Sequence, residues 1–347
     1  MRWWKLTNRG VKVGESIKKV INNEEFSGVV FVKDDNEILF KSASGYSDRT
    51  EERLNNIHTR FGMASGCKLF TAIAVCQLVE KEILSFDTRL KDCLDVVFPH
   101  FDENVTIHHL LTHSSGIPDY FDEEAMDNFE DLWKHTPMYL LKDLHDFLPL
   151  FKNEKMMFKP GERFHYNNAA FIVLGLIVEQ QTGLSFTDYI KTNLFNKCGM
   201  NDSGYFSLDR LPKNTAYGYI YDKGGTWKTN VYSIPIKGGA DGGAYISAPD
   251  MIKLWEALLD HRLISKKYIE LLMTPHIHVK EEVHYGYGIW INKRNNSIFK
   301  YHVMGYDPGV SFHSALYPKS GIKLVIPSNK SSGPFKVMKA IEEYFEI

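Results

Sequence analysis

Strand-like segments lie at the two ends of the chain, and helix-like segments lie between them. Residues 27–33 and 37–44 are rich in β-branched and aromatic side chains and are joined by a short turn of Asp and Asn, which predicts a hairpin. Because residues 29–32 are apolar on both faces of the expected strand, the sheet should be covered on both sides. Further strand-like runs occupy residues 287–292, 298–304, 310–317 and 322–328.

This distribution predicts an α/β (α+β) fold in which residues from both chain ends build one antiparallel sheet. Helical patterns at residues 11–21 and 335–345 should place helices from both ends beside that sheet. We expect residues 1–83 and 236–347 to form a discontinuous α/β sheet domain. Residues 84–235 should form an inserted, mainly helical domain, with a cleft between the two.

The composition is ordinary for a soluble globular protein, with 44% hydrophobic and 24% charged residues. The net charge of −2 points to neither a nucleic acid nor an anionic membrane as a partner, which leaves a small molecule or a short peptide as the expected substrate. The oligomeric state is left open. We find no secretory signal and no apolar run of about 18 residues, so the chain as given is expected to be cytoplasmic, or extracellular if a leader was removed.

A strongly apolar helical pattern at residues 61–82 begins with Ser65 and Lys68. Residues three apart are neighbours on a helix surface, and a lysine at the start of a buried helix is costly to place. The pair indicates a serine nucleophile whose proton is handled by a partly desolvated lysine. The alternative is a serine that caps the helix and a lysine that reaches solvent, and this short pattern alone favours that alternative.

Two distant segments contain groups that could complete such a site. Tyr166 and Asn168 precede a predicted buried helix, and a tyrosinate next to a lysine ammonium would be stabilised as a general base. The strand that ends near Gly305 could supply a backbone N–H to an oxyanion hole together with that of Ser65. Taken alone, each segment is explained as well or better by packing, capping or a plain β-turn.

In their order along the chain, these segments resemble the three motifs of the serine β-lactamase and penicillin-binding protein family. Within it, the chain is similar to class C β-lactamases, low-molecular-weight D-Ala-D-Ala peptidases and related esterases, over roughly residues 15–345. Other segments that look like family signatures are residues 26–30, 59–62, 110–118, 238–244, 285–290 and 307–311.

The resemblance implies a β-lactamase/transpeptidase-like fold with an active site in the cleft between its domains. It implies a serine hydrolase that acts on an ester, an amide or a β-lactam through an acyl-enzyme, without a metal or cofactor. Ser65 would be the acylated nucleophile and Lys68 its proton-handling partner. Tyr166 would be the general base in acylation and the acid to the leaving group. A module of the same fold that is acylated, or only binds, without turnover is the alternative.

The resemblance also implies substrate-binding roles. Asn168 would hydrogen-bond the amide side chain of the substrate. The backbone N–H of Tyr306, the residue after Gly305, would complete the oxyanion hole with that of the nucleophile. The aromatic side chains expected to form pocket walls are Tyr219, Tyr221 and Trp227.

One position departs from the family pattern. The third motif usually opens with Lys or His two residues before its glycine, and anchoring on residues 307–309 places Val303 there. His302 is one residue away and should face the other side by strand alternation, unless a one-residue bulge brings it back. Without a cation, a β-lactam carboxylate or a peptide C-terminus would lack its partner, which favours esters or uncharged amides.

A metal site is not expected. His109 and His113 are four residues apart on a predicted helix, but no carboxylate is placed beside them, so structural roles are favoured. His113 is expected to hydrogen-bond the backbone at the helix end. The four cysteines show no paired spacing, which indicates neither disulfides nor structural zinc.

Overall fold

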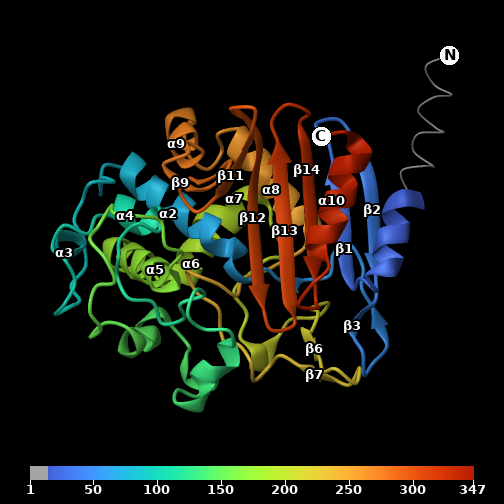
Figure 1. Ribbon diagram of the computed structural model, residues 1–347, viewed down its shortest axis with the longest axis horizontal. Coiled ribbons are helices and arrows are strands. Elements are labelled where there is room, and N and C mark those ends of the chain that lie inside the picture. The colour runs from blue at the N-terminus through green and yellow to red at the C-terminus, as the bar shows by residue number, and fades with distance from the viewer. Residues whose placement is uncertain (1–14) are drawn as a thin grey trace.

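An antiparallel sheet of eight strands forms the centre of the computed structural model, which describes residues 15–347 (Figure 1). The strand order is β2-β1-β14-β13-β12-β11-β10-β9, so strands from both chain ends lie side by side, as predicted. The strands are β1 (Gly28–Lys33), β2 (Ile38–Ser44), β9 (Ile277–Lys280), β10 (Val283–Tyr285), β11 (Trp290–Arg294), β12 (Ser297–Asp307), β13 (Val310–Tyr317) and β14 (Ile322–Ser328).

The sheet is covered on both faces, which confirms the prediction from β1. Val29 and Phe31 belong to the larger core on one face, whereas Val30 and Val32 belong to the smaller core on the other. The smaller core is closed by a helix at residues 15–23 and by α10 (Pro334–Phe345), which lies along the sheet in Figure 1. Helices from both chain ends therefore flank the sheet, as expected.

The larger core surrounds α2 (Lys68–Glu80), which is buried from Lys68 to Val79. A helix that is apolar on all sides is stable only when neighbouring elements enclose it. Here α5 (Asn168–Thr182) is one of those neighbours, and Gly183, with a φ of 68°, ends it. The other α-helices are α3 (Leu90–Cys93), α4 (Ile107–Leu111), α6 (Phe186–Ile190), α7 (Asn196–Cys198), α8 (Ala248–Leu259) and α9 (Lys266–Leu272).

Short elements complete the structure. Three small two-stranded ladders join β3 (Tyr46–Asp48) with β4 (Arg53–Leu54), β5 (Phe61–Gly62) with β8 (Tyr245–Ile246), and β6 (Tyr219–Tyr221) with β7 (Trp227–Thr229). The 3₁₀ turns are η1 (Ala64–Cys67), η2 (Phe129–Lys134), η3 (Met138–Leu140), η4 (Leu144–Leu150) and η6 (Leu208–Arg210), and η5 (Lys191–Phe195) is a π turn.

Among residues 15–347, no single helix has the length and apolar character needed to cross a membrane. The helices Asn168–Thr182 and Phe186–Cys198 meet the criterion only as a pair, with a 77° bend between them. All eight strands of the main sheet fall within the two segments predicted to form the sheet domain. The domain division itself stays a prediction. Its first residues, 1–14, lie outside the described part of the chain, as do the start of the helix predicted at 11–21 and the N-terminus used to predict location.

Candidate active site

Ser65 lies in the turn η1, directly before α2. Ala64 beside it has a φ of 44°, in the left-handed region that costs a residue with a Cβ on the order of 1 kcal/mol. Backbone strain of this kind persists only where the surrounding structure enforces it, and it is common at functional sites. The N-cap residues of η1 and α2 are Met63 and Cys67, and Ser65 Oγ bonds to Lys68, so the capping alternative from the sequence is wrong.

Lys68 is only 1% exposed and does not reach solvent. Its Nζ donates hydrogen bonds to Ser65 Oγ at 3.0 Å, to Asn168 Oδ1 at 2.8 Å and to the backbone oxygen of Asp241 at 2.7 Å. The three N–H groups of an ammonium thus have three uncharged acceptors. The same Nζ lies 4.9 Å from the centre of the Tyr166 ring. The structure therefore brings together Ser65, Lys68, Tyr166 and Asn168.

Tyr166 differs from the expectation in its protonation. Burial raises the pKa of Tyr166 well above its usual value, and the negative charge of Glu123 raises it further. A hydrogen bond with Ser65 acts in the opposite direction without outweighing them. Tyr166 is therefore a neutral phenol here, and the predicted tyrosinate is not stabilised. A phenol of this kind is suited to donate a proton.

His113 holds the Tyr166 segment in place. Its Nδ1 accepts a hydrogen bond from the backbone N–H of Asn167 at 3.0 Å, and its carbonyl accepts one from His165 at 2.8 Å. The expected backbone hydrogen bond of His113 is thus confirmed. The His113 ring also packs on the Tyr166 ring, with 4.4 Å between centroids. Asn167 in turn caps α5 by accepting from Ala170 N at 2.7 Å.

The amide of Asn168 is occupied by the protein itself. Its Oδ1 accepts from Lys68, and its Nδ2 donates to the carbonyl of Phe121 at 3.2 Å. Asp119 anchors the same helix start by accepting from Asn168 N at 2.7 Å and from Ala169 N at 2.9 Å. Burial raises the pKa of Asp119 to about 7 in spite of these donors. Asn168 therefore positions Lys68 in this structure, and its role toward a substrate stays a prediction.

The end of β12 lies directly beside η1. Within the described part of the chain, β11 pairs with β12 only as far as His302, so residues 303–307 have no strand on that side. A Cβ added at Gly305 would lie 2.7 Å from the backbone nitrogen of Ser65, a distance that only glycine avoids. This approach is what an oxyanion hole formed by the N–H groups of Ser65 and Tyr306 requires. That hole itself stays a prediction.

The third motif has no cation at its first position. The register of β12 on β13 is continuous from Tyr301 to Asp307, so the bulge considered for His302 is absent from this stretch. Val303 is buried in the larger core, whereas His302 lines a pocket on the opposite face, toward α10. The alternation predicted from the sequence is confirmed, and the alternative with His302 turned toward the nucleophile is wrong.

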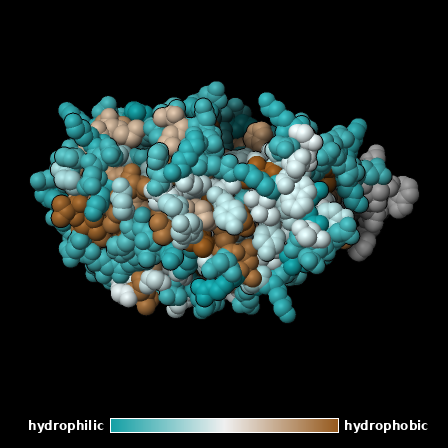
Figure 2. Space-filling view, turned by 90° about the horizontal axis from the view of Figure 1, so that it is seen from below, coloured by the Kyte–Doolittle hydropathy of each residue, from teal (hydrophilic) through white to brown (hydrophobic). Residues whose placement is uncertain are grey.

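The cleft in front of Ser65 combines apolar walls with negative charge. Three carboxylates line it, those of Glu123, Asp241 and Asp307, and none of the described residues that line it is Lys, Arg or His. The end of β12 points to the lower face in Figure 1, and Figure 2, seen from below, shows hydrophobic side chains among hydrophilic ones near the middle of that face. The apolar lining residues include Phe121, Phe129, Phe147, Phe206, Leu208, Ile234, Ile236 and Val310.

Tyr219, Tyr221 and Trp227 do not line this cleft, so the prediction of these pocket walls is wrong. Tyr221 pairs with Trp227 across the β6–β7 ladder, and the Arg49 guanidinium lies 5.4 Å and 5.5 Å from the centres of their rings. Tyr219 Oη accepts from the Arg49 backbone N–H at 2.7 Å. These aromatic rings therefore contact a cation of the protein itself, whereas phenylalanine side chains line the cleft.

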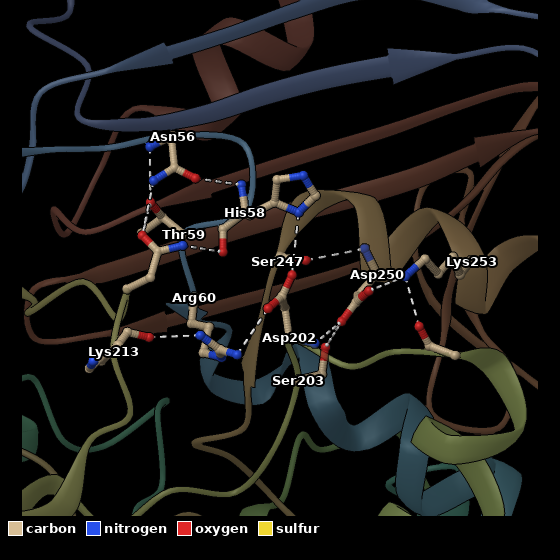
Figure 3. Close-up of polar contacts among 12 residues, drawn as sticks. Asn56, His58, Thr59, Arg60, Asp202, Ser203, Lys213, Ser247, Asp250 and Lys253 are labelled. Carbon is tan, nitrogen blue, oxygen red and sulfur yellow. Dashed lines mark hydrogen bonds and ion pairs between the residues drawn. The ribbon is translucent and has the colours of Figure 1, made fainter.

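A polar network fixes the chain just before Ser65 (Figure 3). Arg60 forms an ion pair with Asp202 at 2.9 Å, and the backbone N–H of Asp202 donates to Asp250 Oδ2 at 2.7 Å. Asp250 also accepts from Ser203 Oγ at 2.9 Å and lies in the first turn of α8. The strand that leads into η1 is thereby tied to α8.

The family model described as Beta-lactamase matches residues 17–346, nearly the whole chain. The chain belongs to the β-lactamase family. Penicillin-binding protein 4* of Bacillus subtilis (strain 168) is 32% identical over 324 residues, which are 88% of this chain and 68% of that protein. The crystal structure of a penicillin binding protein from Bacillus halodurans is 55% identical, with a TM-score of 0.91, over 94% of this chain and 99% of that chain.

More distant solved structures share the fold. D-amino acid amidase from Ochrobactrum anthropi SV3 superposes with a TM-score of 0.77 at 19% identity, over 96% of this chain and 98% of that one. The predicted family and fold class are both confirmed by these comparisons.

The sequence did not identify the cleft carboxylates of Asp241 and Asp307 or the helix-anchoring carboxylate of Asp119, although the first two lie in segments that look like family signatures. Asp241 lies within the glycine-rich passage, and its carboxylate accepts a hydrogen bond from Tyr120 Oη. Asp307 opens the Pro-Gly turn after β12, and Asp119 follows Pro118. The signal available in the sequence was a carboxylate inside a segment that looks like a family signature. No local pattern indicates that the three carboxylates belong to one site.

Proposed function

We propose that the protein is a serine hydrolase that forms an acyl-enzyme at Ser65 and acts on an ester, an amide or a β-lactam. The observation that carries this proposal is the 3.0 Å hydrogen bond between Lys68 Nζ and Ser65 Oγ at a buried helix start. Burying an ammonium costs several kcal/mol, and Lys68 has only uncharged acceptors, with no carboxylate partner among the described residues to offset that cost. Membership of the β-lactamase family supports the same conclusion.

In this proposal, Ser65 Oγ attacks the substrate carbonyl and forms the new C–O bond as the leaving group departs. Tyr166 Oη accepts the serine proton as its own phenol proton passes to the leaving atom, and the Lys68 ammonium stabilises the negative charge that develops on Oγ. The raised pKa of Tyr166 supports its part as the final proton donor. The N–H groups of Ser65 and Tyr306 stabilise the oxyanion. Water then hydrolyses the acyl ester and restores Ser65.

The buried Val303 at the start of the third motif favours substrates without a carboxylate at that point. A cation that would pair with the carboxylate of a β-lactam is missing from this position, and His302 faces away from it. We therefore expect short-chain ester turnover to exceed nitrocefin turnover.

Intact-mass spectrometry tests the proposal. The protein is mixed separately with a fluorophosphonate, a penicillin and a p-nitrophenyl ester, and Ser65→Ala is the control. We expect a fluorophosphonate adduct on the parent protein, none on Ser65→Ala, and ester turnover only by the parent. Identical behaviour of the two proteins, with no adduct and no turnover, would remove the hydrolase proposal.

A second candidate is a module of the same fold that is acylated without turnover. The missing cation of the third motif is the observation that favours it. A stable adduct with the ester or the penicillin, without release of product over hours, would support this candidate over the hydrolase.

A further inference from the structure

A second groove, the outer groove, lies on the face of the sheet that carries α10, and α10 forms one of its walls (Figure 1). His302, Met304 and Tyr306 line it, whereas alternate residues of β12, such as Gly305, face the nucleophile. Its volume of about 800 Å³ is within the range of roughly 300–1,000 Å³ for small-molecule sites. Among the described residues, none lines both the outer groove and the cleft.

Three polar atoms in the outer groove are buried without a hydrogen-bond partner among residues 15–347. They are Nδ1 of His302, Nδ1 of His313 and Oδ1 of Asn292. The two histidines are only 7% and 2% exposed. His313 pairs with Met304 across β12 and β13, so His302 and His313 are diagonal neighbours on one face of the sheet. Because buried polar atoms are nearly always hydrogen-bonded, three such atoms in one groove indicate a polar ligand.

Both imidazoles are uncharged, so each can donate one N–H. Burial lowers the pKa of His302 and of His313, the latter to about 3, and the charge of Lys300 lowers both further. His313 Nε2 shares a hydrogen bond with Tyr306 Oη. When that hydroxyl donates, the ring proton lies on Nδ1, which then donates into the groove. The outer groove thus offers N–H donors to an acceptor such as a carboxylate.

The charged side chains of the outer groove favour an anion. Lys280, Lys300 and Lys339 line it, and Glu124 is the one carboxylate among its described lining residues. Lys300 and Lys339 share the buried carboxylate of Glu342, so the three lysines exceed the two glutamates by one positive charge. The cleft has three carboxylates and no cation among its described lining residues. An anion is therefore attracted to the outer groove and repelled from the cleft.

Aromatic rings form the apolar part of the outer groove. Trp290 and His302 are nearly parallel, with 24° between their rings and 6.4 Å between the ring centres. Phe335 is 51% exposed, and its ring centre lies 5.9 Å from that of His313. Phe164 lines the same groove. A planar aromatic ligand would bury its ring against these side chains while its polar group reaches the imidazoles.

We propose that the outer groove is a second binding site, which takes a small aromatic carboxylate. The carboxylate would accept from the Nδ1–H groups of His302 and His313, where the three lysines leave positive charge in excess. The ring would pack against Trp290 and Phe335, and an N–H or hydroxyl on it would donate to Asn292 Oδ1. This site goes beyond the proposed function, because it shares no described lining residue with the cleft.

Calorimetric titration of the parent protein near neutral pH tests the inference with three indoles. Indoleacetate carries a carboxylate, indoleacetamide is its neutral analogue and tryptamine carries an ammonium. We expect indoleacetate to bind one site per chain about 10-fold more tightly than indoleacetamide, because hydrogen bonds to a charged group are stronger, and tryptamine to bind most weakly. No saturable binding of indoleacetate would show that solvent alone satisfies the imidazoles and would overturn the inference. Equal or tighter binding of indoleacetamide or tryptamine would also overturn it.

A histidine substitution locates the ligand. His302→Phe keeps a ring of similar size and removes the N–H, so it should reduce the preference for indoleacetate over indoleacetamide to less than about threefold. His135→Phe, at an exposed position outside the outer groove, should keep the full preference. An unchanged preference in His302→Phe would overturn the inference.

A lysine substitution guards against a folding defect of His302→Phe. Lys280 is exposed and forms no ion pair with a described residue, so Lys280→Met should fold normally and lower the affinity for indoleacetate about threefold. Lys266→Met, on the exposed face of α9, is the matched control. Equal affinities in these two variants would place the ligand outside the outer groove and overturn the inference.

The two proposals fail separately. Ser65→Ala, which removes the nucleophile, should bind indoleacetate with the affinity of the parent protein. Loss of that binding in Ser65→Ala would place the ligand in the cleft and overturn the inference. Fluorophosphonate labelling of Ser65 without indoleacetate binding would remove the inference and leave the hydrolase. Indoleacetate binding without labelling or ester turnover would remove the hydrolase and leave the second site.

Discussion

Two nearly fully buried lysines have opposite surroundings. Lys68 is 1% exposed, and its three acceptors are a hydroxyl, an amide and a backbone carbonyl. Lys300 on β12 is 4% exposed and forms an ion pair with Glu342 of α10 at 2.7 Å. Glu342 also accepts from Tyr317 Oη at 2.8 Å and from Lys339 at 2.9 Å.

The comparison distinguishes a lysine whose charge stabilises the fold from one whose charge acts on the nucleophile. At Lys300, the charge is neutralised by the carboxylate that it touches, and the pair fastens α10 to the sheet. At Lys68, the charge is bonded to the nucleophile, and the nearby carboxylates remain without direct contact to it. Burial alone does not identify a functional lysine, because the identity of its acceptors decides what its charge can do.

The largest expected effect is on catalysis at Lys68. Lys68→Met should lower ester turnover and fluorophosphonate labelling of Ser65 by at least about 10³-fold, because the ammonium bonded to the nucleophile is lost. Lys300→Met, the matched change at a buried lysine outside the site, should leave labelling within about threefold. Stopped-time assays of ester turnover and of fluorophosphonate labelling, run on both variants, measure these losses. Equal losses in the two would contradict the distinction.

The second effect is on stability at Lys300. Lys300→Met should lower the free energy of unfolding by about 2 kcal/mol, because it leaves Glu342 buried with one cation fewer. The usual cost of breaking a buried pair is about 3–5 kcal/mol, and Tyr317 and Lys339 reduce it. Urea denaturation measures the change, and Lys266→Met on the exposed face of α9 is the control. A loss no larger than in Lys266→Met would show that the ion pair contributes nothing.

The smallest effect is on the pH dependence of stability. The folded pKa of Asp307, raised to about 7 by burial first, lies above its unfolded value near 3.8, so stability should fall as pH rises between these values. Asp307→Asn should remove about 1 kcal/mol of that fall, since a partly exposed carboxylate is screened.

Glu342 should show the opposite sign. Burial raises its pKa, but Lys300 and three hydrogen bonds outweigh burial and lower the folded value below the ordinary 4.5. Its contribution to stability is therefore present above the unfolded pKa and is lost as pH falls through the folded one. Glu342→Gln should flatten the acid limb of a thermal-denaturation profile, while Asp307→Asn flattens the limb between about pH 4 and 7. If both substitutions changed the slope of stability against pH in the same direction, the contrast between the two sites would be contradicted.

The sequence by itself determined the sheet, the buried helix and the family. The strands β13 and β14 have the predicted bounds, since runs of apolar residues that end at turn residues encode their own limits. The helix after Ser65 is buried because it is apolar on every side. The short strands β9 and β10 and the helix α9 went unpredicted, because a few residues carry too little periodicity to identify them.

Only the tertiary structure decided the electrostatics of the site. Two of the three acceptors of Lys68 come from positions 100 and 173 residues away along the chain, so no local pattern could assign them. The neutral state of Tyr166 follows from burial and from the charge of Glu123, both of which are properties of the packed molecule. The position of the Asp307 carboxylate, in the same cleft as Ser65, also depends on how distant segments pack together. Local periodicity specifies elements, whereas desolvation and charge depend on which elements meet.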